Sequence, residues 1–148
     1  MIHLRKTRVL LSVVFVLGLG ACTQKASEPE PAAQTIYAPG DSIQVAGRLV
    51  DTRCFHLDKE ANIHNDHTRP EGQVPACAQA CARQGIPVAL LEDGDLQGRV
   101  WILGGYPSQL YAEYMAGTVR VEGEVRSQGV ILPSKVEYKN GDTWTRIL

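Results

Sequence analysis

Three cysteines constrain the folding of this chain more than any other feature. Cys77 and Cys81 stand four residues apart in an alanine-rich run that ends at Pro87, and Cys54 precedes them. Residues i and i+4 share one face of a helix, so both sulfurs would point the same way. Three histidines lie in the same part of the chain: His56, His64 and His67. Residues 54–81 therefore hold the thiol and imidazole groups with which the domain could bind a soft or borderline metal ion.

The first 21 residues have the pattern of a secretory signal peptide. Three cations, Arg5, Lys6 and Arg8, precede an apolar run from Val9 to Leu19 that is too short to be a membrane span. The next residues, through Ala21-Cys22, resemble the lipobox of bacterial lipoproteins. The resemblance implies cleavage before Cys22 and a lipid on its thiol. Thr23 is typical of sorting to the outer membrane, so we expect a lipid-anchored envelope protein that faces the periplasm.

The charge of the processed chain argues against nucleic-acid binding. Three of the 15 basic residues lie in residues 1–21 and none of the 16 acidic ones does, which leaves 12 against 16 and a net charge of -4. Nucleic-acid binding needs clustered Lys and Arg, and no such stripe remains. We expect the membrane, through the lipid, and an envelope protein as partners.

The composition divides the processed chain into a tether and one domain. Residues 22–40 are polar, rich in Pro and Ala and poor in large apolar side chains, which is typical of a flexible tether. Residues 41–148 have a length that suits a single domain with one modest core.

The first half of this domain reads as a strand, a long loop and a helix. Ile43, Val45 and Leu49 alternate along a strand that runs to about Arg53, and Gly47 indicates a bulge or a close backbone approach. The segment from Leu57 to Val74 has no sustained period and is predicted to be a loop. A helix is predicted from Pro75 to about Gln84, with Gly85 as its stop.

The second half reads as strands around one more helix. A hairpin is predicted over residues 87–103, a short helix over Ser108–Met115, and strands over residues 118–126, 130–138 and 143–147. Five or six short strands with a helix between the third and fourth are the plan of an OB-like barrel. We therefore predict a mainly β domain, a small OB-like barrel with two short helices; a small β-sandwich is the alternative.

Two motifs carry a resemblance to a known family. Asp51-Thr52-Arg53-Cys54 and the stretch from Cys77 to Pro87 resemble the D-x-x-C and C-A-x-x-C-x-x-x-G-x-P motifs of small exported bacterial domains with an OB-like fold and no established activity. The similarity spans about residues 45–125. Members often carry a His three positions before the first helix cysteine, where this chain has Val74.

The cysteines leave three functions open. A thiolate trio with an imidazole as fourth ligand suits copper or zinc, which makes Cys54, Cys77, Cys81, His56, His64 and His67 the candidate metal ligands. Alternatively, a disulfide from Cys54 to Cys77 or Cys81 would staple the helix to the first strand and stabilise the fold by about 3 kcal/mol. A periplasmic thiol-disulfide redox protein is the third hypothesis, and it lacks the alternating strand and helix pattern of thioredoxin-like folds. No catalytic constellation is evident, so we expect a non-enzymatic binding protein.

Overall fold

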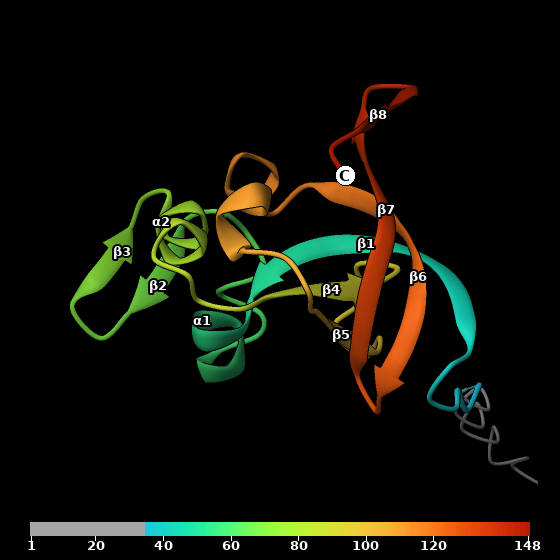
Figure 1. The fold of residues 1–148 in the computed structure, drawn as a ribbon. Helices are drawn as coiled ribbons and strands as arrows, with labels where there is room; N and C mark the ends of the chain where they lie inside the picture. Colours follow the sequence, from blue (N-terminus) through green and yellow to red (C-terminus); the bar gives the residue numbers. More distant parts are fainter. Residues whose placement is uncertain (1–34) are drawn as a thin grey trace, which may run out of the picture. The chain divides into compact units, whose positions relative to one another are not determined.

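The computed structural model describes residues 35–148 (Figure 1). The predicted signal peptide of residues 1–21, the lipidation site Cys22 and the tether up to residue 34 lie outside the described residues. No helix in the described part is long and apolar enough to cross a membrane.

Six strands form the main sheet of the domain. They are β1 (Ser42–Asp51), β4 (Val88–Glu92), β5 (Val100–Leu103), β6 (Thr118–Ser127), β7 (Val130–Asn140) and β8 (Thr143–Arg146), in the spatial order β5-β4-β1-β6-β7-β8. All neighbours in this order are antiparallel. A short parallel pairing of β5 with β7 closes the strands from β5 to β7 into a ring. The last strand, β8, pairs with β7 outside this ring. The prediction of a mainly β, OB-like barrel is confirmed.

Alternating apolar residues fill the inside of this barrel. On β6, Val119, Val121 and Val125 are buried while the residues between them are less so, as the period-2 pattern predicts. On β1, Gly47 meets the backbone of β4 so closely that an added Cβ would lie 2.0 Å from the carbonyl oxygen of Leu91. The expected close approach at Gly47 is therefore present, and it lets β1 and β4 curve together into the barrel.

An insertion between β1 and β4 carries the cysteines. It contains α1 (Thr52–Leu57), a separate two-stranded hairpin of β2 (His67–Arg69) and β3 (Gly72–Val74), and α2 (Cys77–Arg83). In Figure 1 these elements lie together at one end of the domain, away from Thr35, where the described chain begins. The insertion thus places all three cysteines at the end of the barrel opposite to where the described chain begins.

The insertion corrects three details of the sequence prediction. The first strand ends at Asp51 rather than Arg53, because Thr52 begins α1. The predicted loop between Leu57 and Val74 contains β2 and β3, whose three-residue strands are too short to show a period. Residues 35–148 hold three helices rather than two, because α1 accompanies α2 and the 3-10 helix η1 (Ser108–Tyr114).

Residues just before β1 contact the barrel. The ring of Tyr37 packs edge-on against Trp101, with 5.5 Å between centroids, and the guanidinium of Arg99 lies over both rings. Arg99 also donates to the carbonyl oxygen of Thr35 at 2.6 Å. The end of the predicted tether, residues 35–40, is thus held against the domain.

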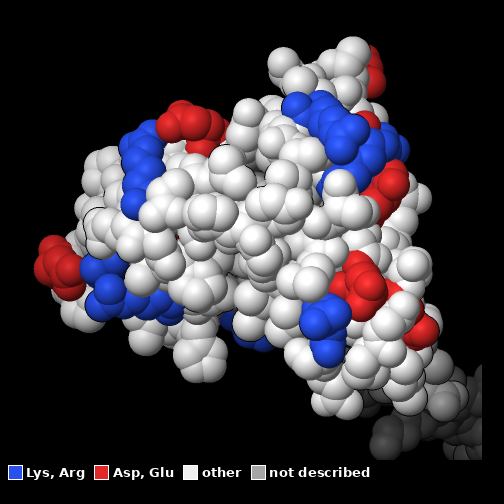
Figure 2. All heavy atoms as spheres, viewed as in Figure 1, with Lys and Arg blue, Asp and Glu red and all other residues white. Residues whose placement is uncertain are grey.

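The visible surface mixes charges of both signs. Figure 2 shows Lys and Arg side chains in several separate groups, most of them next to Asp or Glu. On β6, Arg120 donates through Nε to Glu137 at 2.8 Å, and Lys135 lies 3.2 Å from both Glu122 and Glu137. This face has no continuous basic stripe.

Candidate metal centre

Asp51 positions the first cysteine. It is fully buried at the end of β1, and its Oδ1 accepts a hydrogen bond of 2.9 Å from the backbone N–H of Cys54. This is an N-cap, in which the side chain satisfies a free N–H of the first helical turn. The D-x-x-C motif therefore has a local cause: the cap starts α1 and directs Cys54 inward, where it is 1% exposed.

The loop before β2 positions the other two cysteines by capping α2. The carboxylate of Asp66 accepts from the backbone N–H of Ala76 at 2.8 Å, and the carbonyl oxygen of Asn65 accepts from that of Ala78 at 3.0 Å. The helix begins at Cys77, two residues after Pro75, and ends before Gly85, whose φ of +84° suits a helix stop. Cys77 and Cys81 are both buried on its inner face.

His67 brings an imidazole to the cysteines. It lies on β2 and is completely buried. Its Nε2 lies 2.9 Å from the carbonyl oxygen of His64, and because a carbonyl oxygen only accepts, Nε2 carries the proton. The other ring nitrogen, Nδ1, has no hydrogen-bond partner among residues 35–148 and lies 3.5 Å from Oδ2 of Asp51. Ligating histidines commonly donate their other N–H to a carbonyl in this way.

The potential ligand atoms form two groups that share Cys54. Cys54, His67 and Cys77 offer donor atoms that lie within 4.8 Å of one another, and so do Asp51, Cys54 and Cys81. All five side chains are buried. Within residues 35–148, the partly buried apolar residues that pack against the three cysteines are Val74 and Ile86. The three cysteines and His67 therefore form one buried cluster within the insertion.

Arg69 places a positive charge beside two of the sulfurs. Its Nη2 donates to Cys54 Sγ at 3.3 Å and to Cys77 Sγ at 3.2 Å. These two contacts raise the pKa of the Arg69 guanidinium. A charge-assisted bond of this kind favours the thiolate form of Cys54.

Burial opposes the negative charge on Cys54 that Arg69 favours. Desolvation raises the pKa of the Cys54 thiol, and the nearby Asp51 and Cys77 add to the effect, while Arg69 lowers it. Desolvation raises the pKa of Cys81 to about 12, with Asp51 as the next cause. Both groups are neutral thiols at pH 7 unless a cation compensates their charge.

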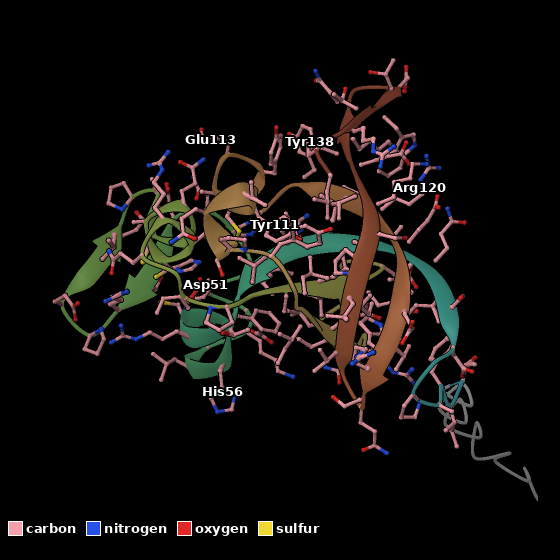
Figure 3. All side chains as sticks on the ribbon, viewed as in Figure 1. Asp51, His56, Tyr111, Glu113, Arg120 and Tyr138 are labelled. Carbon is pink, nitrogen blue, oxygen red and sulfur yellow. The ribbon has the colours of Figure 1, made fainter. Side chains whose placement is uncertain are left out.

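The structure separates the sequence candidates. It brings Cys54, Cys77, Cys81 and His67 together. His56 is exposed and extends from α1 away from the domain (Figure 3). His64 is exposed as well, and its Nδ1 lies 3.3 Å from Nη1 of Arg48. Neither His56 nor His64 belongs to the two ligand groups among the described residues.

The three cysteines of the described domain are free thiols. The disulfide alternative, Cys54 with Cys77 or Cys81, is therefore not formed in this structure. Cys54 is nevertheless the sulfur that both partners approach.

The sequence did not predict Asp51 and Arg69 as residues of the site. The position of Asp51 could have been recognised, because an Asp three residues before a helical cysteine is typical of an N-cap. That of Arg69 could not, since one Arg in a polar segment does not indicate what it contacts. His67 pairs directly with Val74 in the β2–β3 ladder, so an imidazole lies next to the position where the resemblance predicts a histidine.

Comparison with protein-family models, with curated proteins and with solved structures found no match to this chain. The resemblance of residues 45–125 to small exported domains therefore stays a prediction.

Proposed function

We propose that this protein is a non-enzymatic metal-binding lipoprotein of the bacterial envelope, which holds copper or zinc in its cysteine cluster. The observation that carries the proposal is Nδ1 of His67: a buried nitrogen with no hydrogen-bond partner in the described domain, 3.5 Å from Oδ2 of Asp51, in a ring grouped with two sulfurs. An unpartnered buried polar atom is costly. A metal ion bound to it would remove that cost.

The donor set favours soft or borderline ions. Thiolate ligands suit Cu(I) and Zn(II), imidazole suits zinc and copper, and hard ions such as Mg²⁺ and Ca²⁺ take oxygen ligands. Cys54, Cys77, Cys81 and His67 together have the composition of a closed tetrahedral zinc site. Cys54, Cys77 and His67 alone would suit a three-coordinate copper ion.

Burial of the cysteines supports a binding role over redox catalysis. Catalytic thiols need partial exposure and a lowered pKa, because the thiolate is the nucleophile. Here all three are at most 4% exposed, and the pKa values of Cys54 and Cys81 are raised. The redox hypothesis therefore remains the weakest of the three.

The cellular place is inferred from the N-terminal sequence. The n-region, the short apolar run and the lipobox favour a lipid on Cys22 and an anchor in the outer membrane. Periplasmic conditions are oxidising, so the thiols persist there only if metal or burial protects them. An envelope protein that delivers or receives the ion is the expected partner.

Metal content and thiol counting test the proposal together. The protein purified under reducing conditions should hold about one equivalent of zinc, and Cys54→Ser should lose it. In a second preparation made without reductant, alkylation after metal removal under denaturing conditions should modify Cys54, Cys77 and Cys81, as intact mass reports. A product with only one of them alkylated and no bound metal would support the disulfide-stapled interaction module instead.

A further inference from the structure

The ligand atoms of the cluster fall into two groups rather than one. The first contains the Cys54 and Cys77 sulfurs with the imidazole of His67, and the second contains the Cys54 and Cys81 sulfurs with the carboxylate of Asp51. Each group offers two sulfurs, which can hold one soft ion between them, and one lighter donor close to them. Cys54 belongs to both.

The sulfur spacing suits an ion between each pair. With a metal–sulfur distance of about 2.3 Å, two thiolates on opposite sides of one ion lie about 4.6 Å apart, and two at tetrahedral angles lie about 3.8 Å apart. In the structure, Cys54 Sγ lies within 4.8 Å of the sulfur of Cys77 and within the same distance of that of Cys81. Each pair can therefore be joined by one ion with small side-chain adjustments.

Asp51 places an unsatisfied buried oxygen in the second group. Its Oδ1 is engaged by the backbone N–H of Cys54, whereas its Oδ2 has no hydrogen-bond partner in the described part of the chain and lies 3.5 Å from Nδ1 of His67. The residue is fully buried. A buried carboxylate oxygen without a partner is rare, and in this position a cation between Asp51, Cys54 and Cys81 would satisfy it.

The charge of the buried groups decides how many ions the cluster can hold. With all three thiols ionised, the thiolates and Asp51 carry four negative charges and Arg69 carries one positive charge, which leaves three in excess. One monovalent ion leaves an excess of two, and a second reduces it to one. Uncompensated buried charge is costly, so a second monovalent ion stabilises the cluster.

We propose that the cluster binds two cuprous ions, one in each ligand group, with the thiolate of Cys54 as the ligand that bridges them. The inference rests on the proposed metal-binding function and adds a second binding position to it. Cys77 and His67 complete the first position, and Cys81 completes the second as a two-thiolate site, beside which the carboxylate of Asp51 adds negative charge. A single divalent zinc ion leaves the same excess of one charge, so the site would take two cuprous ions or one zinc ion.

Native mass spectrometry with Cu(I), supplied as its acetonitrile complex to the reduced protein, tests the proposal. The unmodified protein should bind two copper ions, and Cys81→Ser and Cys77→Ser should each bind one. His64→Ala, in the same insertion but outside both groups, is the matched control and should bind two. Saturation of the unmodified protein at one copper, or a second copper that survives Cys81→Ser, would overturn the bridged pair.

Two further measurements test the bridged copper pair independently of the variants. X-ray absorption of the unmodified protein loaded with copper should show copper–copper scattering, and its absence would contradict the bridged pair even if a variant failed to fold. A separate zinc titration distinguishes this inference from the proposed function. If the protein binds one zinc ion in that titration but only one copper ion in the copper titration, the proposed metal centre stands and the second binding position is rejected. Binding of neither ion would remove both.

Discussion

Nδ1 of His67 lies 3.5 Å from Oδ2 of Asp51, and neither atom has a hydrogen-bond partner within residues 35–148. Asp51 belongs to the end of β1 and His67 to a hairpin that pairs with no other strand. Two buried polar atoms from separate elements thus face each other beside the cysteines. A cation held there would join the insertion to the barrel.

Asp51→Ala should destabilise the domain through its cap. The substitution removes the acceptor for the Cys54 N–H and should lower the free energy of unfolding by about 1 kcal/mol. Asp51→Asn is the control, since its amide oxygen can still cap α1. Chemical denaturation of the reduced protein in the presence of a chelator measures both. Equal losses in the two variants would show that the cap is not the cause.

Arg69→Met should weaken zinc binding. The methionine keeps an apolar stem but removes the N–H donor to the Cys54 and Cys77 sulfurs, so the metal-bound thiolates lose a charge-assisted bond. Loss of a supporting contact of this kind costs about 10-fold to 100-fold in affinity. The matched control is Arg83→Met on α2: the Arg83 side chain is 54% exposed and pairs with Glu113. If both variants bind zinc as the unmodified protein does, Arg69 does not support the ligands.

Gly47→Ala should prevent the barrel from closing properly. Its Cβ would lie 2.0 Å from the backbone oxygen of Leu91, which cannot move without breaking the β1–β4 ladder, and we expect a loss of about 3 kcal/mol. Gly104→Ala offers a comparison, because its nearest neighbour, at 3.2 Å, is the flexible side chain of Leu132. Thermal unfolding should show a much larger decrease for the first variant, and similar values would contradict the close approach.

Acid should weaken the β6–β7 pair through Glu137. The hydrogen bond from Arg120 is the main cause that lowers the pKa of Glu137 below its ordinary value of 4.5, and burial partly opposes it. A group whose pKa is lowered in the folded state stabilises the fold at pH values above its ordinary pKa. This contribution is lost as the pH falls from the ordinary pKa through the lowered one. Glu137→Gln should therefore show a flatter decrease of stability in this acid range. Parallel curves for the two proteins would contradict the assignment.

The barrel could be predicted from the sequence because its signals are local. Val119, Val121 and Val125 alternate on β6, and Gly129 and Gly141 stand at turns, where both adopt positive φ. A period-2 pattern over ten residues is long enough to identify a strand and its buried face. The hairpin of β2 and β3 offers only three residues a strand, and Asn62, rather than an apolar face, ties it to α1.

The cluster was predictable in its thiols and not in its other members. Three cysteines in residues 54–81 indicated a shared site, since so few chemical roles suit them. Nothing local separates His67 from His56 and His64, because burial of His67 follows from its pairing opposite Val74 and from its bond to the His64 carbonyl. Such selection depends on tertiary contacts, and the same holds for Arg69.

The zinc affinity of His67→Ala beside His64→Ala tests the metal centre most directly. Both histidines belong to the insertion, but only His67 is buried with the sulfurs. His67→Ala removes a ligand and should weaken zinc binding by at least about 100-fold, more than loss of a supporting contact does. His64→Ala should bind as the unmodified protein does, because its backbone carbonyl still accepts from His67. Equal affinities for the two variants would contradict a metal centre that includes His67.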